Sequence, residues 1–172
     1  MNQVQKKLSK EIPHTYLKKC VNFIITRANT YLFMTNVDGS IISDIESKWE
    51  IQPIRNNQIT LVNTSDKAVY LEFGVGVVGQ KQSHPNSEIT NYQYNVPSHS
   101  KTKVGSWAFY VDESRGIDIV AGLYSVIAKD NGKTVAVTKG SPSQMYLYNA
   151  MMDLISTGEY KKLWEETLNE TL

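Results

Sequence analysis

The sequence has little of three things: cysteine, net charge and long apolar runs. Cys20 is the single cysteine among 172 residues, so no disulfide can form within the chain and the fold does not depend on an oxidising compartment. The 18 basic and 17 acidic residues leave a formal net charge of +1, which gives no overall basic surface for non-specific DNA binding. Runs such as Val21–Ile25 are too short to span a membrane. The lysine-rich start, Met1–Lys10, has no apolar stretch behind it, so we expect no signal peptide, no membrane partner and folding in the cytoplasm.

An apolar content of 41% and a charged content of 20% are typical of an ordered protein, and the length favours a single domain over residues 1–172. Residues 1–35 form a helical segment, which Pro13 is expected to divide, with the longer helix over His14–Thr30. The apolar positions of that helix repeat at helical spacing: Leu17, Val21, Ile24, Ile25 and Ala28. Cys20 lies beside this face, and because no Cys–His–acid arrangement is apparent we expect a buried thiol rather than a nucleophile.

Residues 49–138 are expected to form the sheet. Alternating apolar residues over 49–54 and 58–64, joined by two asparagines, predict a hairpin, while 107–111 and 134–138 predict further strands. Residues 41–45 fit either a short helix or the sheet. The polar segment 80–104 shows no period and is expected to be a long loop, the kind of segment that often carries function.

The last segment, residues 141–172, is expected to be helical. Ser141 is predicted as its N-cap, Pro142 as its first helical residue, and Gly158 as the break between two helices. The order of elements favours an α+β fold, with a mainly antiparallel sheet packed by an N-terminal and a C-terminal helix.

Signals for chemistry are few, and we expect no catalytic residue, no cofactor and no metal. His84 and His99 lie in one polar loop with Glu88 between them, but their spacing matches no common metal site and loop-packing histidines are the favoured interpretation. A cluster of acids, Asp112, Glu113 and Asp118, is best explained as a solvated turn. The run Gly74–Gly79 matches G-x-G-x-x-G, yet no helix is expected to follow it, so its glycines are interpreted as tight turns at the end of a strand.

Three blocks of sequence, taken in order, resemble a known family. The segment Tyr70–Gly79 followed by His84-Pro85 is similar to Y-x-E-F-G-T-G-x-x-G … H-P, with Val75 at the usual threonine. Gly105–Tyr110 is similar to a Gly-Trp-x-Tyr strand with two residues inserted, and Thr138–Ala150 resembles T-x-G-x-P-[SA]-x-x-F-M-Y-x-A. Together these blocks resemble the head–tail joining and tail-completion (neck) proteins of long-tailed siphophages, relatives of the lambda minor tail protein Z.

The resemblance implies a structural component of the virion neck or tail, assembled in the host bacterial cytoplasm. It implies a ring oligomer, expected to be hexameric, that contacts other phage neck and tail proteins while DNA passes through its channel without specific recognition. The residues expected at the contact between subunits are Glu72, Phe73, Gly74, Gly76, Gly79, His84, Pro85 and His99. Two alternatives stay open: a metal-dependent hydrolase that uses the loop histidines, and a prophage-encoded protein-binding module.

Overall fold

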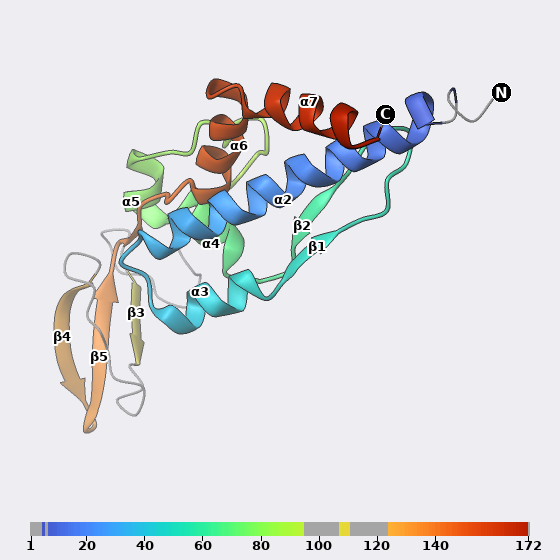
Figure 1. Ribbon diagram of the computed structural model, residues 1–172. Coiled ribbons are helices and arrows are strands. Elements are labelled where there is room, and N and C mark those ends of the chain that lie inside the picture. Colours follow the sequence, from blue (N-terminus) through green and yellow to red (C-terminus); the bar gives the residue numbers. More distant parts are fainter. Residues whose placement is uncertain (1–4, 6, 95–106, 111–123, 172) are drawn as a thin grey trace. The chain divides into compact units, whose positions relative to one another are not determined.

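The computed structural model describes residue 5 and residues 7–94, 107–110 and 124–171, which belong to two compact units (Figure 1). Unit 1 contains residues 1–34, 40–65 and 146–172, and unit 2 contains residues 35–39 and 66–145. Helices and antiparallel strands occur together, so the fold is α+β, as the sequence predicts. The single domain expected from the chain length stays a prediction.

A long helix, α2 (Ile12–Phe33), is the centre of unit 1. Pro13 does not divide the helical segment: it lies in the first turn of α2, where no backbone N–H is needed, and one turn of π-helix, η1 (Lys7–Glu11), precedes it. The predicted apolar stripe is confirmed by the burial of Val21 and Ala28, and Leu32 extends it. Cys20 is buried as expected, and this burial raises the pKa of its thiol.

The hairpin predicted around the two asparagines is confirmed. Strands β1 (Trp49–Ile51) and β2 (Leu61–Asn63) pair antiparallel, with Trp49 opposite Asn63. Asn56 and Asn57 both have positive φ, of 51° and 57°, as a tight hairpin turn requires. Before the hairpin, residues 41–45 belong to a helix, α3 (Gly39–Glu46), rather than to the sheet.

Polar side chains tie this hairpin to the helices of unit 1. The Nε1–H of Trp49 donates to Oδ1 of Asn29 on α2 at 2.9 Å. The amide of Asn63 donates to the carbonyl of Ile45 on α3 at 2.8 Å. The ring of Trp49 also meets the buried ring of Tyr146 edge to face, with 6.4 Å between centroids, a favourable geometry for aromatic pairs.

The C-terminal segment forms two helices, α6 (Tyr146–Ser156) and α7 (Glu159–Thr171), and Gly158 separates them with a φ of 76°, as predicted. The predicted start of this segment is wrong. Ser141 is not an N-cap, because it belongs to a short strand, α6 begins only at Tyr146, and residues 140–145 hydrogen-bond to residues 71–76 in unit 2. Tertiary hydrogen bonds therefore override a local capping signal.

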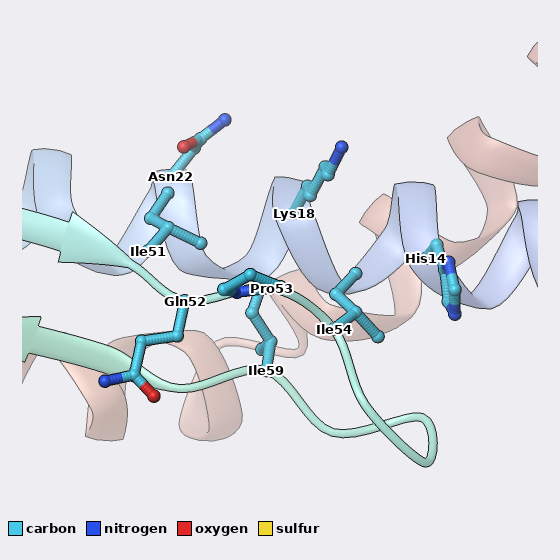
Figure 2. A pocket seen from close by; sticks show the side chains of 8 residues that line it. All are labelled: His14, Lys18, Asn22, Ile51, Gln52, Pro53, Ile54 and Ile59. Carbon is cyan, nitrogen blue, oxygen red and sulfur yellow. The ribbon is translucent and has the colours of Figure 1, made fainter.

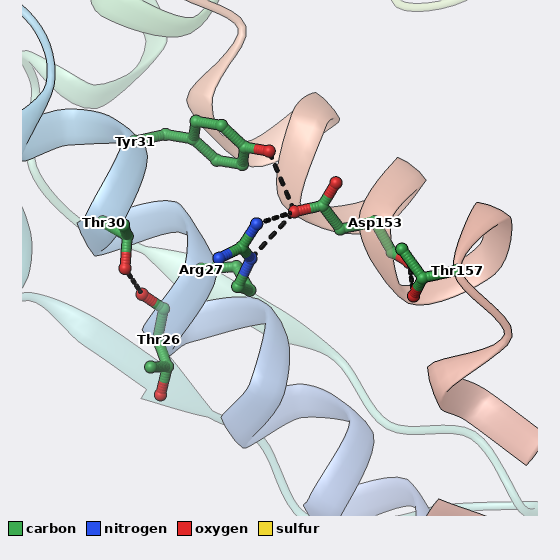
Figure 3. A network of polar contacts seen from close by, with 6 residues as sticks. All are labelled: Thr26, Arg27, Thr30, Tyr31, Asp153 and Thr157. Carbon is green, nitrogen blue, oxygen red and sulfur yellow. Dashed lines mark hydrogen bonds and ion pairs between the residues drawn. The ribbon is translucent and has the colours of Figure 1, made fainter. Parts of the chain in front are cut away.

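One carboxylate joins α6 to α2 (Figure 3). Oδ2 of Asp153 accepts hydrogen bonds from the guanidinium of Arg27, with Nε at 2.8 Å, and from the hydroxyl of Tyr31 at 2.8 Å. Burial by itself raises the pKa of Asp153, but the hydrogen bonds from Arg27 and Tyr31 and the charge of Arg27 together lower it below its ordinary value. The ionised form of Asp153 is thus favoured in the folded chain.

Unit 2 combines two short helices with a second sheet. The helices are α4 (Ala68–Phe73) and α5 (Gly76–Lys81), and the strands are β3 (Trp107–Tyr110), β4 (Tyr124–Asp130), β5 (Lys133–Thr138) and β6 (Gly140–Ser141). β5 lies between β3 and β4, and both pairings are antiparallel. The strands predicted at 107–111 and 134–138 are confirmed by β3 and β5, while β4 was not predicted.

The expected loop over 80–104 is described as far as residue 94, and residues 82–94 consist of turns without strands. His99 and the acids Asp112, Glu113 and Asp118 lie outside the described residues. Within the described ranges, no helix has both the length and the apolar character needed to cross a bilayer.

Asp153→Asn should lower the free energy of unfolding at neutral pH by about 1 kcal/mol. The amide accepts hydrogen bonds more weakly than the carboxylate, and the loss is limited because the Arg27 side chain is 41% exposed and screened by water. The pKa of Asp153 is lowered from 3.8 in the folded chain, so its stabilisation is complete above that value and disappears as pH falls through the lowered pKa.

Urea unfolding followed by circular dichroism, from neutral pH to about pH 3, should therefore show the stabilities of wild type and variant converging in acid. Glu159→Gln is the matched control, since its ion pair with Lys162 lies at the surface and should change stability by less than about 0.5 kcal/mol. A constant difference between wild type and Asp153→Asn across this range would contradict the assignment.

Candidate functional site

Two segments distant in sequence, residues 71–79 and 139–145, run together in unit 2. The backbone N–H of Gln144 donates to the carbonyl of Leu71 at 2.8 Å, and the hydroxyl of Ser143 donates to the carbonyl of Glu72. Isolated antiparallel bridges join Val75 to Ser141 and Gly76 to Gly140. The first and third blocks of the family resemblance therefore contact each other directly.

Two glycines permit this close approach. A Cβ atom on Gly74, whose φ is 76°, would lie 2.6 Å from the backbone nitrogen of Ser143. A Cβ atom on Gly140, whose φ is 111°, would lie 1.9 Å from the carbonyl oxygen of Val75. No side chain fits at either position, and both backbone conformations are ones that L-residues rarely adopt.

The glycine run itself differs from its predicted form. It follows a helix, α4, rather than a strand, and it opens a helix, α5, where none was expected. Gly76, with a φ of 63°, turns the chain into α5, and the N–H of Val78 donates to the carbonyl of Lys139 at 3.3 Å. The contact with Lys139 comes from a segment far along the chain, so the local pattern could not reveal it.

A buried acid–histidine pair lies beside these glycines. Nε2 of His84 is 2.9 Å from Oε1 of Glu72, and the two side chains are only 2% and 8% exposed. The N–H of Asn86 donates to Nδ1 of His84 at 3.0 Å, so Nδ1 carries the lone pair and the ring proton is on Nε2. Nε2–H then donates to the Glu72 carboxylate, and both ring nitrogens are engaged within the chain.

Aromatic rings surround this pair. The ring of Phe73 lies 4.4 Å from that of His84 and stacks on Tyr92 at 4.6 Å, while Tyr92 meets Tyr94 edge to face at 4.9 Å. Tyr92 donates to the carbonyl of Gly74 at 2.8 Å, and Tyr94 accepts from the N–H of His84 at 2.8 Å. Burial, with smaller effects of Tyr70 and Tyr94, raises the pKa of Tyr92 to about 12, so its hydroxyl stays a donor.

The sequence did not identify Tyr92, Tyr94 or Ser143 as members of this site. The two tyrosines did leave a signal, because they are paired large side chains within a segment that is otherwise polar. Ser143 showed no such signal in the sequence, because it was predicted to lie in the first turn of a helix, and that helix begins only at Tyr146. Its role depends on a contact with Glu72 that only the folded chain makes.

The residues predicted at a subunit interface differ in how far they are buried within this chain. Five of them are buried in this chain: Glu72, Gly74, Gly76, Gly79 and His84. Phe73 is half-buried, Pro85 is exposed, and His99 lies outside the described residues. Their role between subunits stays a prediction, and the large apolar side chains exposed next to them on α4 are Val69 and Tyr70.

The residues considered for a metal site do not gather in the part of the chain that the structure describes. His84 is buried with both ring nitrogens engaged, whereas Glu88 is exposed. Among the described residues, no group of three or more histidine, cysteine, aspartate or glutamate side chains could hold a metal ion.

No protein-family model matches the chain, and no curated protein or solved structure matches it. The function is therefore inferred from the residues of the chain and their geometry.

Gly74→Ala should destabilise unit 2 by about 3 kcal/mol or more, because the added methyl group overlaps the backbone of residues 141–143. Gly158→Ala is the matched control: its φ is also 76°, but a Cβ there meets nothing within 4 Å, so about 1 kcal/mol is expected. Hydrogen–deuterium exchange over residues 68–85 should accelerate in the first variant alone. Equal exchange in both variants would contradict the close approach.

Glu72→Ala should cost about 2 kcal/mol, because the Nε2 proton of His84 stays buried without this acceptor. Glu72→Gln keeps an acceptor oxygen and should cost about half as much. Urea unfolding measures both variants, and heteronuclear NMR of the imidazole nitrogens should find the proton of wild-type His84 on Nε2. A proton on Nδ1 would refute the hydrogen-bond assignment.

Proposed function

We propose that this chain is a structural protein of a long-tailed bacteriophage virion, acting in tail completion or head–tail joining at the neck, and that it is not an enzyme. The proposal begins from the three blocks of sequence that resemble the neck proteins. A signature shared for structural reasons should consist of residues that contact one another and build one local fold.

That expectation agrees with the geometry of unit 2. The first block supplies Glu72 and Gly74, which contact the third block through Ser143. The second block contributes β3, where Trp107 pairs with Thr138, the first residue of the third block. The contiguity of all three blocks is the observation that carries the proposal.

The polar groups of the site are used to hold the chain together. The Glu72 carboxylate, both ring nitrogens of His84 and the hydroxyls of Tyr92 and Tyr94 each have a hydrogen-bond partner within the chain. A catalytic site instead needs groups that face a substrate. This arrangement favours a structural role for the site.

Assembly into a ring needs surface that a neighbouring subunit can cover. On α4, Tyr70 is 53% exposed and Val69 is 41% exposed, and both belong to the same short helix as the buried Glu72. We place one subunit contact of the proposed ring, expected to be hexameric, on these two side chains. Other neck and tail proteins are the further partners, and DNA would pass without specific recognition, in keeping with the net charge of +1.

Removing the gene from its phage tests this role. Negative-stain electron microscopy of the lysate should show separate full heads and tails, or tails of aberrant length, and a plasmid copy of the gene should restore complete virions. Normal infectious particles without the protein would refute the proposal.

Complementation with Tyr70→Glu should fail, because a charge on the proposed contact opposes burial between subunits. Gln80→Glu, which adds the same charge at an exposed position of α5, should restore virions. Circular dichroism of both purified variants should match wild type, so that failure reflects assembly rather than folding. Full complementation by Tyr70→Glu would contradict the placement of a subunit contact on α4.

A further inference from the structure

A groove lies along unit 1, between α2 and the hairpin that joins β1 to β2 (Figure 2). Its volume is about 480 Å³, which lies within the range of ligand pockets. The lining residues are His14, Lys18 and Asn22 from α2, and Ile51, Gln52, Pro53, Ile54 and Ile59 from the hairpin. None of them belongs to the site in unit 2.

The two walls of the groove differ in chemistry. Residues 14, 18 and 22 are four positions apart, so they share one face of α2 and form a polar row. Opposite them the hairpin presents a mostly apolar row, in which Ile51 is 42% exposed (Figure 2). A ligand for this groove therefore needs both apolar and polar groups along its length.

Among the residues that line the groove, the formal charge is the single positive charge of Lys18. No carboxylate lines the groove, and among the described residues none forms an ion pair with Lys18. The nearest acids in sequence, Glu11 and Glu50, are not among the lining residues. A smaller pocket on the same hairpin is lined by Arg55 and likewise by no acid. The ligand that complements this surface is an anion.

The hairpin wall of the groove is held by hydrogen bonds within the chain. Arg55 and Gln58 exchange backbone hydrogen bonds of 3.1 and 2.9 Å across the asparagine turn, and the N–H of Gln52 donates to the carbonyl of Thr60 at 2.9 Å. These bonds fix the apolar wall, while α2 fixes the polar one. Binding to a preformed groove loses less conformational entropy than binding that must order it.

We propose that this groove binds an extended acidic peptide segment of a partner protein. Its carboxylates would pair with Lys18 and accept a hydrogen bond from the ring of His14, and alternate apolar side chains would cover Ile51 and Ile54. A single-stranded nucleic acid is the weaker candidate, because such sites stack bases mainly on large aromatic rings and no phenylalanine, tyrosine or tryptophan is among the described residues that line the groove. This inference does not depend on the proposed virion role.

The test uses the full chain and a fluorescein-labelled peptide, Glu-Leu-Glu-Leu-Glu, followed by fluorescence anisotropy. The peptide should bind, and its affinity should fall as salt is added, because exposed charges are screened. A matched peptide with glutamine at every glutamate should bind at least about tenfold more weakly. Equal affinity for the two peptides would overturn the proposal.

Variants locate the binding. Lys18→Glu should weaken it by about tenfold or more, and Ile54→Ser by about fivefold, with unchanged circular dichroism. Lys161→Glu, at an exposed lysine that does not line the groove, is the control and should keep wild-type affinity within about twofold. Unchanged binding by Lys18→Glu would overturn the proposal.

Two further results would show that the groove binds something other than an acidic peptide, and either would refute the proposal. One is a dimer in analytical ultracentrifugation that Lys18→Glu dissociates, since a second copy would then cover the groove. The other is a single-stranded oligonucleotide that binds more tightly than the acidic peptide and loses affinity in Lys18→Glu.

Discussion

The backbone around Gly74 passes so close to the backbone of residues 140–143 that no side chain fits between them. Because of this contact, the carbonyls of Leu71 and Glu72 accept hydrogen bonds from Gln144 and Ser143. The backbone carbonyl of Glu72 therefore accepts a hydrogen bond from the distant segment, and its side-chain carboxylate accepts one from His84. The buried pair thus depends on a contact made possible by residues that have no side chain at all.

A buried carboxylate is costly unless it is hydrogen-bonded, and His84 supplies a hydrogen bond to Oε1 of Glu72. His84 donates from Nε2, the N–H of Asn86 fixes which nitrogen carries the proton, and the rings of Phe73 and Tyr92 pack around the pair. Among the described residues, no buried side-chain nitrogen or oxygen lacks a partner. Such a network favours one conformation of the segment from α4 to Tyr94.

The sequence predicted the parts of the fold that depend on local periodicity and turn chemistry. The stripe through Val21 and Ala28, the turn at Asn56-Asn57 and the break at Gly158 are all set by neighbouring residues. It failed at residues 141–145, where a favourable N-cap and proline are overruled by hydrogen bonds to a segment far along the chain. The Glu72–His84 pair was unpredictable for the same reason, since its two members come from different elements and no period relates them.

The near-zero net charge of the chain conceals a local imbalance along one groove of unit 1. The chain has 18 basic and 17 acidic residues in total, yet the described residues that line the groove beside α2 include Lys18 and His14 and no carboxylate. A subunit of a ring or a neck must use at least two different surfaces, because a heterologous contact joins unlike patches on successive copies or on unlike proteins. Val69 and Tyr70 expose apolar area, while the groove exposes a positive charge at Lys18, so the two surfaces are unlike in this sense. Apolar burial sets how firmly such a subunit is held, while charge complementarity sets which partner it accepts and how fast it meets that partner.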